Sequence, residues 1–307
     1  MINYSKKWLS LIIGIFLVLM TGCDSDNSDK IVYLNFDGTD AFGGILIRDE
    51  VLNGAKSKGL NIDYYDAKGD SNTQIDQMKS AIEMKPKAIV LLAINGDAMI
   101  PFVKRANNAN IPVVTVNRDA NGGDRIRVYS DEYEAGRLQA DYMIKSLPQG
   151  ANVVYLEGMS NLVLSVQRWE GFSKELMAKR PDVHILDVQD GKFSKSEAMK
   201  IMSLWLSSYP KIDAVVCGND QMALGAISAL KLSNRLAGCQ VSGIDAIDEA
   251  LKAVENGEMV QTVKQDGIKQ AAGVVTVLEQ ISKGETPTDI NVPFTSVTKE
   301  NLAQFKK

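Results

Sequence analysis

Short apolar runs alternate with longer amphipathic stretches along most of the chain. Strands that alternate with helical periodicity are typical of βαβ units and parallel sheets. The apolar runs predict strands at Ile31–Phe36, Asn61–Asp66, Ala88–Ala93, Pro112–Val116, Arg127–Tyr129, Asn152–Glu157, His184–Gln189, Ala214–Cys217, Gln240–Ile244 and Val260–Val263. The amphipathic stretches predict helices at Gly44–Lys58, Thr73–Met84, Gly96–Asn108, Glu132–Leu147, Val166–Lys179, Ser194–Ser208, Gln221–Leu230, Ala246–Glu255 and Gly267–Lys283.

This plan of helix, turn and strand occurs about four times before residue 128 and about four times after it. The repetition predicts an α/β protein with two similar, doubly wound parallel-sheet lobes. Right-handed crossovers bring the carboxyl ends of all strands in a lobe to one edge, where open α/β sheets bind ligands. The residues that follow each strand are therefore the candidates for function.

The N-terminus carries the pattern of an export signal. Lys6 and Lys7 precede an apolar run, Trp8–Met20, that is shorter than the roughly 18 residues of a membrane-spanning helix. The segment Leu19–Cys23 resembles a bacterial lipoprotein box, which implies a signal peptide over residues 1–23 and lipidation of Cys23. An ordinary cleaved signal and an uncleaved anchor are the alternatives. The lipoprotein reading places the protein on the extracytoplasmic face of the cell membrane or in the periplasm.

Composition narrows the function classes. Residues 24–30 are polar and predict a flexible tether, and about 277 residues then remain, enough for two lobes. The net charge of −4 and the absence of a basic patch argue against nucleic acid as a partner. A single histidine, His184, cannot build a metal site or a catalytic triad, so we expect no metal and no cofactor. Cys217 and Cys239 fall at opposite ends of neighbouring predicted strands, which predicts two free thiols.

The ends of the predicted strands carry polar and aromatic side chains with little acid-base character. Carboxylates, amides and guanidinium groups suit a ring of hydroxyls, because each hydroxyl both donates and accepts a hydrogen bond. An aromatic ring suits the C–H face of a sugar. The candidates are Asp40, Phe42, Asn117, Arg118, Arg168, Phe193, Asn219, Asp245 and Gln265.

Three blocks of sequence, at residues 111–118, 216–226 and 241–245, resemble the periplasmic ribose- and galactose-binding proteins of ABC importers. The resemblance covers essentially the whole chain after the tether. It implies the type I periplasmic binding protein fold, with two lobes joined by a three-segment hinge that closes on a sugar. The implied N-terminal lobe comprises residues 31–130 and 266–292, and the implied C-terminal lobe comprises residues 131–265 and 293–307.

The same resemblance implies roles for the candidates. Asp40, Asn117, Asn219, Asp245 and Gln265 match hydroxyl partners. The remaining candidates match donors from the two lobes or stacking aromatic rings, and they are Arg118, Arg168, Phe42 and Phe193.

Departures from the family pattern leave the sugar open. The ribose type has Asp where this chain has Asn117, and the galactose type has Lys in place of Arg118 and an acid in place of Leu164. The calcium loop of the galactose type is absent near residues 148–150, so we expect no calcium there. A hexose, a pentose and a cyclic polyol such as inositol all fit this pattern.

Several candidates also have a purely structural interpretation. Asp40 could cap the helix that follows it, and Phe42 and Phe193 could belong to the core. Arg168 could pair with Glu170 or Asp190. Of the two neighbours Asn219 and Asp220, the sequence favours Asp220 as the helix cap and Asn219 as the ligand contact.

The leading hypothesis is therefore a monomeric, lipid-anchored protein that captures a monosaccharide or polyol for the membrane subunits of an ABC permease. A sensor that presents its sugar to a chemoreceptor or a sensor kinase would have the same fold. An enzyme using Asp40 and Asp245 as a carboxylate pair is disfavoured, because the chain has no nucleophile motif.

Overall fold

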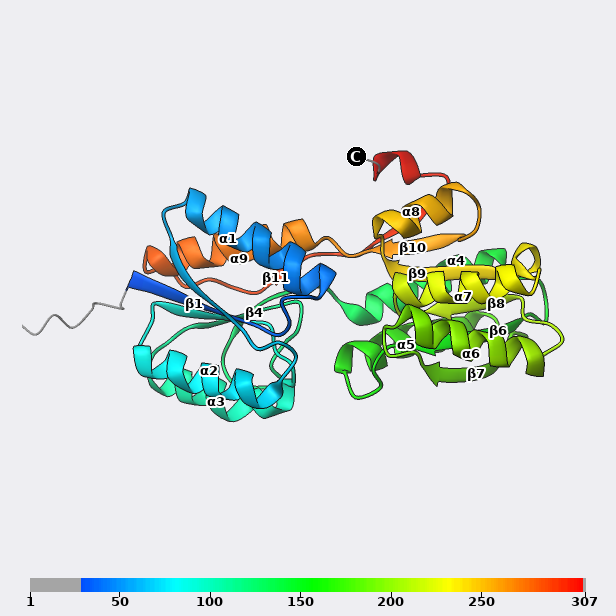
Figure 1. Ribbon diagram of the computed structural model, residues 1–307. Helices are drawn as coiled ribbons and strands as arrows, with labels where there is room; N and C mark the ends of the chain where they lie inside the picture. The colour runs from blue at the N-terminus through cyan, green and yellow to red at the C-terminus, as the bar shows by residue number, and fades with distance from the viewer. Residues whose placement is uncertain (1–28, 306–307) are drawn as a thin grey trace, which may run out of the picture.

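The computed structural model describes residues 29–305 and contains two sheets in two lobes (Figure 1). The predicted signal peptide, Cys23 and most of the tether lie outside the described residues. The strands of the N-terminal lobe are β1 (Lys30–Asn35), β2 (Asn61–Asp66), β3 (Ala88–Leu91), β4 (Val113–Val116), β5 (Ile126–Tyr129) and β11 (Ile290–Asn291). Those of the C-terminal lobe are β6 (Asn152–Glu157), β7 (His184–Asp190), β8 (Ala214–Cys217), β9 (Gln240–Asp245), β10 (Gln261–Lys264) and β12 (Thr295–Thr298).

The two sheets have the same winding. The strand order is β11-β5-β4-β3-β1-β2 in one lobe and β12-β10-β9-β8-β6-β7 in the other. All pairs are parallel except β10 with β12. In both lobes the order reverses beside the first strand, and the carboxyl ends at such a switch point form a natural ligand crevice. The predicted fold class is confirmed.

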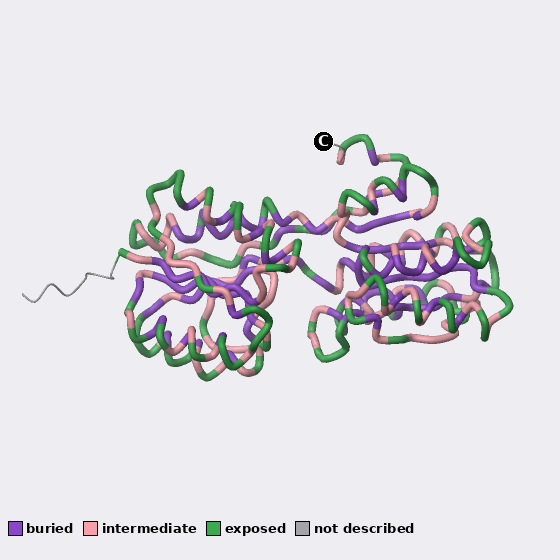
Figure 2. Tube along the Cα trace, in the orientation of Figure 1, coloured by how far each residue is buried: buried purple, intermediate pink, exposed green. Residues whose placement is uncertain are grey.

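Helices cover both faces of each sheet, and Figure 2 shows the resulting buried strands between more exposed helices. This explains the unbroken apolar runs of β3, β4 and β8, whose residues are buried on both sides. The N-terminal lobe contains the π-helix η2 (Ala41–Ile47), α1 (Arg48–Ser57), α2 (Ser71–Met84), α3 (Gly96–Asn108) and α9 (Gly267–Ser282). The C-terminal lobe contains α4 (Glu132–Ser146), α5 (Val163–Lys179), α6 (Lys195–Ser208), α7 (Asp220–Leu232), α8 (Asp248–Glu255) and the short 3₁₀ turns η3 (Leu236–Gly238) and η4 (Leu302–Gln304).

The chain passes between the lobes three times. The first crossover joins β5 to α4, the second joins β10 to α9, and the third joins β11 to β12. Strands β11 and β12 are absent from the sequence-based prediction. They are short, and β12 contains a single fully buried residue, Val297, so no apolar run marks them.

The two cysteines of the C-terminal lobe are buried free thiols, as predicted. Ala214 of β8 pairs with Gln240 of β9, so Cys217 lies at the carboxyl end of its strand while Cys239 precedes the start of the next strand. Parallel pairing therefore keeps the two sulfur atoms apart.

Glycines allow α4 and α5 to pack very closely. A Cβ atom on Gly136 would overlap the carbonyl oxygen of Arg168, and one on Gly171 would overlap the carbonyl oxygen of Tyr133. This contact joins the start of α4 to the middle of α5 and sets the distance between Glu132 and Arg168.

We expect Gly136→Ala to lower the free energy of unfolding by about 2 kcal/mol. Alanine gains up to about 1 kcal/mol of helix propensity, but overlap with a rigid backbone typically costs about 1–3 kcal/mol, and the neighbouring helix must also move. Urea denaturation of the wild type and the variant measures the difference. Gly238→Ala is the matched control, because nothing lies within 4 Å of its Cβ position and its change should stay below about 0.5 kcal/mol. Equal stability of Gly136→Ala and wild type would contradict the close packing.

Candidate binding cleft between the lobes

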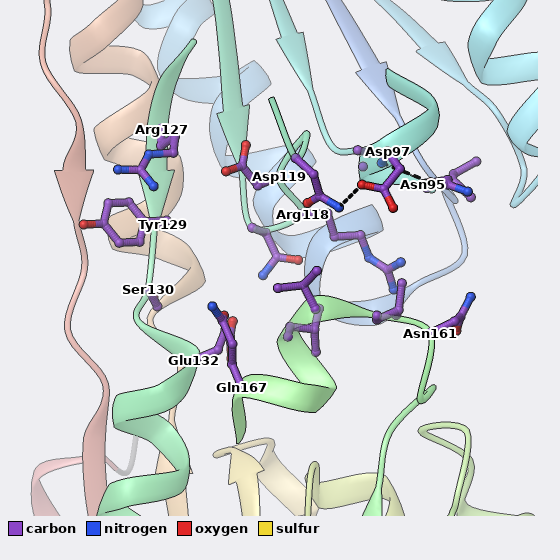
Figure 3. Close-up of a pocket in the computed structure, with 18 of the residues that line it drawn as sticks. Asn95, Asp97, Arg118, Asp119, Arg127, Tyr129, Ser130, Glu132, Asn161 and Gln167 are labelled. Atoms are coloured by element: carbon purple, nitrogen blue, oxygen red, sulfur yellow. Dashed lines mark hydrogen bonds between the residues drawn. The ribbon is translucent and has the colours of Figure 1, made fainter. Parts of the chain in front are cut away.

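A cavity of about 710 Å³ lies between the lobes at the carboxyl ends of the strands (Figure 3). The N-terminal lobe lines it with residues 93–97, after β3, and with residues 117–119 and 121, after β4. The C-terminal lobe contributes residues 161–164 and Gln167, around the first turns of α5, together with Glu132 of α4. In Figure 3 Arg118 and Asp119 stand on one side of the cavity, and Glu132 and Gln167 stand on the other. Most of the lining residues have polar side chains, so the space suits a small hydrophilic molecule.

A buried ion pair joins Glu132, which lines the cavity, to Arg168, which lies behind the C-terminal wall and does not line it. The Nε atom of Arg168 donates to Glu132 Oε2 at 2.6 Å, and Nη1 donates to the carbonyl oxygen of Gly218 at 2.6 Å. The side chains are only 5% and 8% exposed. Burial raises the pKa of Glu132, and Arg168 opposes that rise. Burial also disfavours the charged form of Arg168, but Glu132 and Asp245 outweigh it and raise the pKa of the guanidinium.

Residues of all three crossovers surround this ion pair. Glu132 follows the first crossover, and Gln265 in the second donates to Glu132 Oε1 at 3.4 Å. Phe294 in the third lies under Arg168, with the guanidinium carbon 5.9 Å from the ring centroid. The ion pair therefore lies where the segments that join the lobes come together.

Asp245 does not line the cavity, but its carboxyl group interacts electrostatically with this ion pair. It ends β9 and has a φ of 121°, and Ala246 after it has a φ of 57°. Burial raises the pKa of Asp245 to about 7, with smaller contributions from Glu132 and Asp40, while Arg168 opposes the shift. Asp245 therefore interacts electrostatically with Arg168 and Glu132 of its own lobe and with Asp40 of the other lobe.

Asn219 and Asp220 have the reverse of their expected capping roles. Asn219 caps α7, because its Oδ1 accepts a hydrogen bond from the backbone N–H of Met222 at 3.0 Å. Asp220 is fully buried and points instead toward the turn after β9. The preference for Asp220 as the cap was wrong, since the helix begins one residue earlier than the pattern indicated. Asn219 does not line the described cavity, and its contact with a ligand stays a prediction.

The N-terminal lobe supplies Asn117 and Arg118, which both line the cavity. Asn117 has a φ of 60°, a conformation that directs the chain sharply out of β4. The guanidinium of Arg118 lies 4.0 Å from the ring centroid of Phe36. Burial lowers the pKa of Arg118, and Asp40 and Asp37 oppose the shift. Arg168 of the other lobe also lowers it, so the two guanidinium groups are close enough to interact electrostatically.

Asp40 and the two predicted stacking rings also have contacts within their own lobes. Asp40 caps η2 by accepting from Gly43 N at 2.8 Å. The ring of Phe42 lies against Gly267, and the ring of Phe193 covers Gly158 so closely that a Cβ atom there would overlap it. Both rings are partly buried, and neither lines the described cavity. Their stacking role stays a prediction.

Glu132 is the most important residue of the cleft that sequence reasoning did not select. The pattern placed it inside a helix, and the expected partners of Arg168 were Glu170 or Asp190, which are closer to it in sequence. The structure instead joins residues 36 positions apart. Asn95 and Asp97, which follow β3 and line the cavity, were also missed, although the rule that function follows each strand applied to them. Asn161 and Gln167 gave no comparable signal.

Two structural findings bear on other classes of function. Within residues 29–305, no cluster of three or more histidine, cysteine, aspartate or glutamate side chains is arranged to hold a metal ion. Across the same part of the chain, no helix combines the length and apolar composition needed to cross a membrane.

Comparison with known proteins decides the family. Residues 31–286 match the family described as the periplasmic binding protein domain. The chain belongs to this family. It is 32% identical over 251 residues to the xylitol-binding protein of Mycolicibacterium smegmatis, a match that covers 81% of this chain and 71% of that protein. It is 27% identical over 281 residues to the ribose import binding protein of Salmonella typhimurium, covering 91% of this chain and 94% of the relative.

Solved structures of periplasmic binding proteins give the same result. The ABC transporter solute binding protein of Bacillus halodurans C-125, solved with bound myo-inositol, superposes with a TM-score of 0.85 at 31% identity. The match covers 92% of this chain and 98% of that structure. The predicted resemblance to sugar-binding proteins of ABC importers is therefore confirmed. Family members are binding components of transporters, and membership implies an extracytoplasmic protein.

Proposed function

We propose that this chain captures a neutral monosaccharide or cyclic polyol in the cleft and delivers it to the membrane subunits of an ABC permease. One observation supports the proposal: the buried Arg168–Glu132 pair interacts electrostatically with Asp245, and these groups also interact with Asp40 and Arg118 of the other lobe. The ligands named for relatives, which include xylitol, ribose and myo-inositol, support a polyhydroxylated ligand.

The chemistry of these side chains suits adjacent hydroxyl groups. The guanidinium groups of Arg118 and Arg168 only donate hydrogen bonds, whereas ionised Asp40 and Asp245 only accept them. A vicinal diol satisfies both kinds of group, because each of its hydroxyls donates once and accepts. Hydrogen bonds with one charged partner contribute about 1.5–3 kcal/mol each, so a few of them give micromolar affinity, about −8 kcal/mol.

Binding would also close the lobes. A ligand that contacts both walls stabilises the closed arrangement relative to the open one, because only the closed arrangement makes all contacts at once. We propose residues 31–130 with 266–292 and residues 131–265 with 293–307 as the two moving bodies. The crossover segments near Glu132, Gln265 and Phe294 would then act as the hinge.

Isothermal titration of the chain from Asp29 onward, against D-galactose, D-glucose, D-ribose and myo-inositol, tests the function. We expect saturable heat with at least one of them and no release of aryl alcohol from aryl glycosides, because the protein binds without performing chemistry. The absence of heat throughout the panel would contradict the proposed ligand class. Turnover of an aryl glycoside would contradict the binding-only role.

We further propose that the protein acts as a monomer tethered to the membrane through a lipid on Cys23. The N-terminal sequence supports this attachment, and no observation favours sensing over import. We expect the wild-type protein to sediment with membranes and to label with palmitate, while Cys23→Ser should do neither, because the thiol is the site of lipidation. Cys239→Ser is a matched control that keeps the leader intact. Membrane-bound, labelled Cys23→Ser would contradict the anchor.

A further inference from the structure

A buried carboxyl group outside the cleft is hydrogen-bonded to the turn that carries Asp245. Asp220, in the first turn of α7, is 0% exposed. Its Oδ1 accepts from the hydroxyl of Thr262 at 2.8 Å, and its Oδ2 accepts from the backbone N–H of Ile247 at 3.0 Å. The Thr262 hydroxyl in turn accepts from the N–H of Ala246 at 3.2 Å. Asp220 therefore connects α7 and β10 to the turn between β9 and α8.

That turn is strained. Asp245 and Ala246 are consecutive residues other than glycine with positive φ, at 121° and 57°. Such conformations persist only where surrounding contacts hold them, and they concentrate at ligand sites. Helix α8 begins at this turn, and its N-cap, Ile247, has no side chain that can accept from the helix. Asp220 instead accepts from the N–H of Ile247 itself and so fixes the residue from which the helix starts.

The chain leaves room for this carboxylate. Gly243 of β9 pairs with Thr262 of β10, and a Cβ atom at Gly243 would overlap Oδ1 of Asp220. Gly243 therefore leaves the space in which Asp220 reaches its hydrogen-bond partner Thr262, next to the turn. The pKa of Asp220 is raised well above its usual range by burial and then by Asp245, so the two carboxyl groups also interact electrostatically.

We infer that Asp220 is a positioning residue of the cleft, which holds the strained Asp245–Ala246 turn and so fixes where the Asp245 carboxylate meets a ligand hydroxyl. That a ligand meets Asp245 rests on the proposed function, whereas the role of Asp220 rests on its hydrogen bonds around the turn. Asp220 itself is assigned no contact with the ligand. Its effect on binding must therefore pass through Asp245.

A double-mutant cycle on the full-length protein tests this dependence, with myo-inositol as the titrant. We expect Asp220→Asn to weaken binding by about 10-fold in the wild type and by less than about 2-fold in the Asp245→Asn background, because neighbours in one network couple. Asp213→Asn is the matched control. Asp213 is also a buried acid of this lobe, but it accepts from Asn152 N at the opposite edge of the sheet, so binding should not change. An equal loss in both backgrounds, or a loss of stability alone, would overturn the inference.

Thr262 supplies a second test that leaves every charge in place. Thr262→Val removes the hydroxyl that joins Asp220 to Ala246 and should weaken binding. Thr262→Ser keeps the hydroxyl and should bind with wild-type affinity. If no ligand of the panel, myo-inositol included, gives heat with the wild type, the proposed ligand class fails separately. An NMR titration that follows the resonance of the Asp245 carboxyl carbon against pH then tests the inference without a ligand. We expect Thr262→Val to move the midpoint of this titration by about half a pH unit or more and Thr262→Ser to leave it unchanged; a midpoint unchanged in both would reject the role of Asp220.

Discussion

Arg168→Met is expected to weaken binding of the panel sugar with the highest affinity by about 100-fold or more. In the proposed function Arg168 donates charge-assisted hydrogen bonds to the ligand, and a loss of about 3 kcal/mol corresponds to a factor of about 100. The substitution also leaves Glu132 buried without its ion-pair partner, and breaking such a pair typically costs about 3–5 kcal/mol of stability. Titration calorimetry measures the first effect and thermal unfolding measures the second.

The two effects can be separated with a second substitution. In Arg168→Met/Glu132→Gln the buried charge is gone, so we expect stability to recover in part while binding stays weak. Arg105→Met is the matched control, because Arg105 lies on the N-terminal lobe, is half exposed, and is 3.9 Å from Glu83 in a surface ion pair of little energetic consequence. If Arg168→Met bound the sugar with wild-type affinity, Arg168 would not contact the ligand and the proposed site would be wrong.

Binding should strengthen as the pH rises from about 5 to 8, with a midpoint near the pKa of about 7 of Asp245. Ionised Asp245 accepts hydrogen bonds from ligand hydroxyls, whereas the protonated acid must donate one. The charged groups that influence this carboxyl are Arg168 on α5, Glu132 on α4, Asp40 before η2 and Asp220 on α7. Only Arg168 is positive, and burial with the neighbouring acids outweighs it. Titrations at pH 5, 6, 7 and 8 measure the dependence.

Folding stability should have the opposite pH dependence. Between the ordinary value of 3.8 and about 7, the folded chain holds a proton on Asp245 that the unfolded chain has released. The free energy of unfolding therefore falls as the pH rises through this window, because the folded state binds more protons. In Asp245→Asn both dependences should flatten. If Asp245→Asn kept the full pH dependence of binding, a group other than Asp245 would be responsible for it.

Sequence patterns sufficed for most of the fold because the sheets are covered on both faces. Buried parallel strands such as β3, β4 and β8 must be apolar along their whole length, and the helices between them must have one apolar side, so both leave a periodic signal. The same logic selected Asn117 and Arg118, which line the cavity, since the carboxyl ends of parallel strands meet at one edge.

Partners distant in the chain needed the tertiary structure. Arg168 has nearby acids in sequence, yet its partner is Glu132, which the close contact of α4 and α5 at Gly136 and Gly171 brings to it. Asp220 looks like a helix cap in sequence, yet it holds a turn that follows a different strand. Strands β11 and β12 are too short for any periodicity.

The sequence by itself determined the number of lobes, the winding of their sheets and the edge where the cleft lies, because these depend on periodic burial. Only the tertiary structure decided which charges pair inside the cleft and which residue holds Asp245 in its strained conformation. Those choices depend on contacts between segments far apart in the chain, which leave no local pattern for the sequence to reveal.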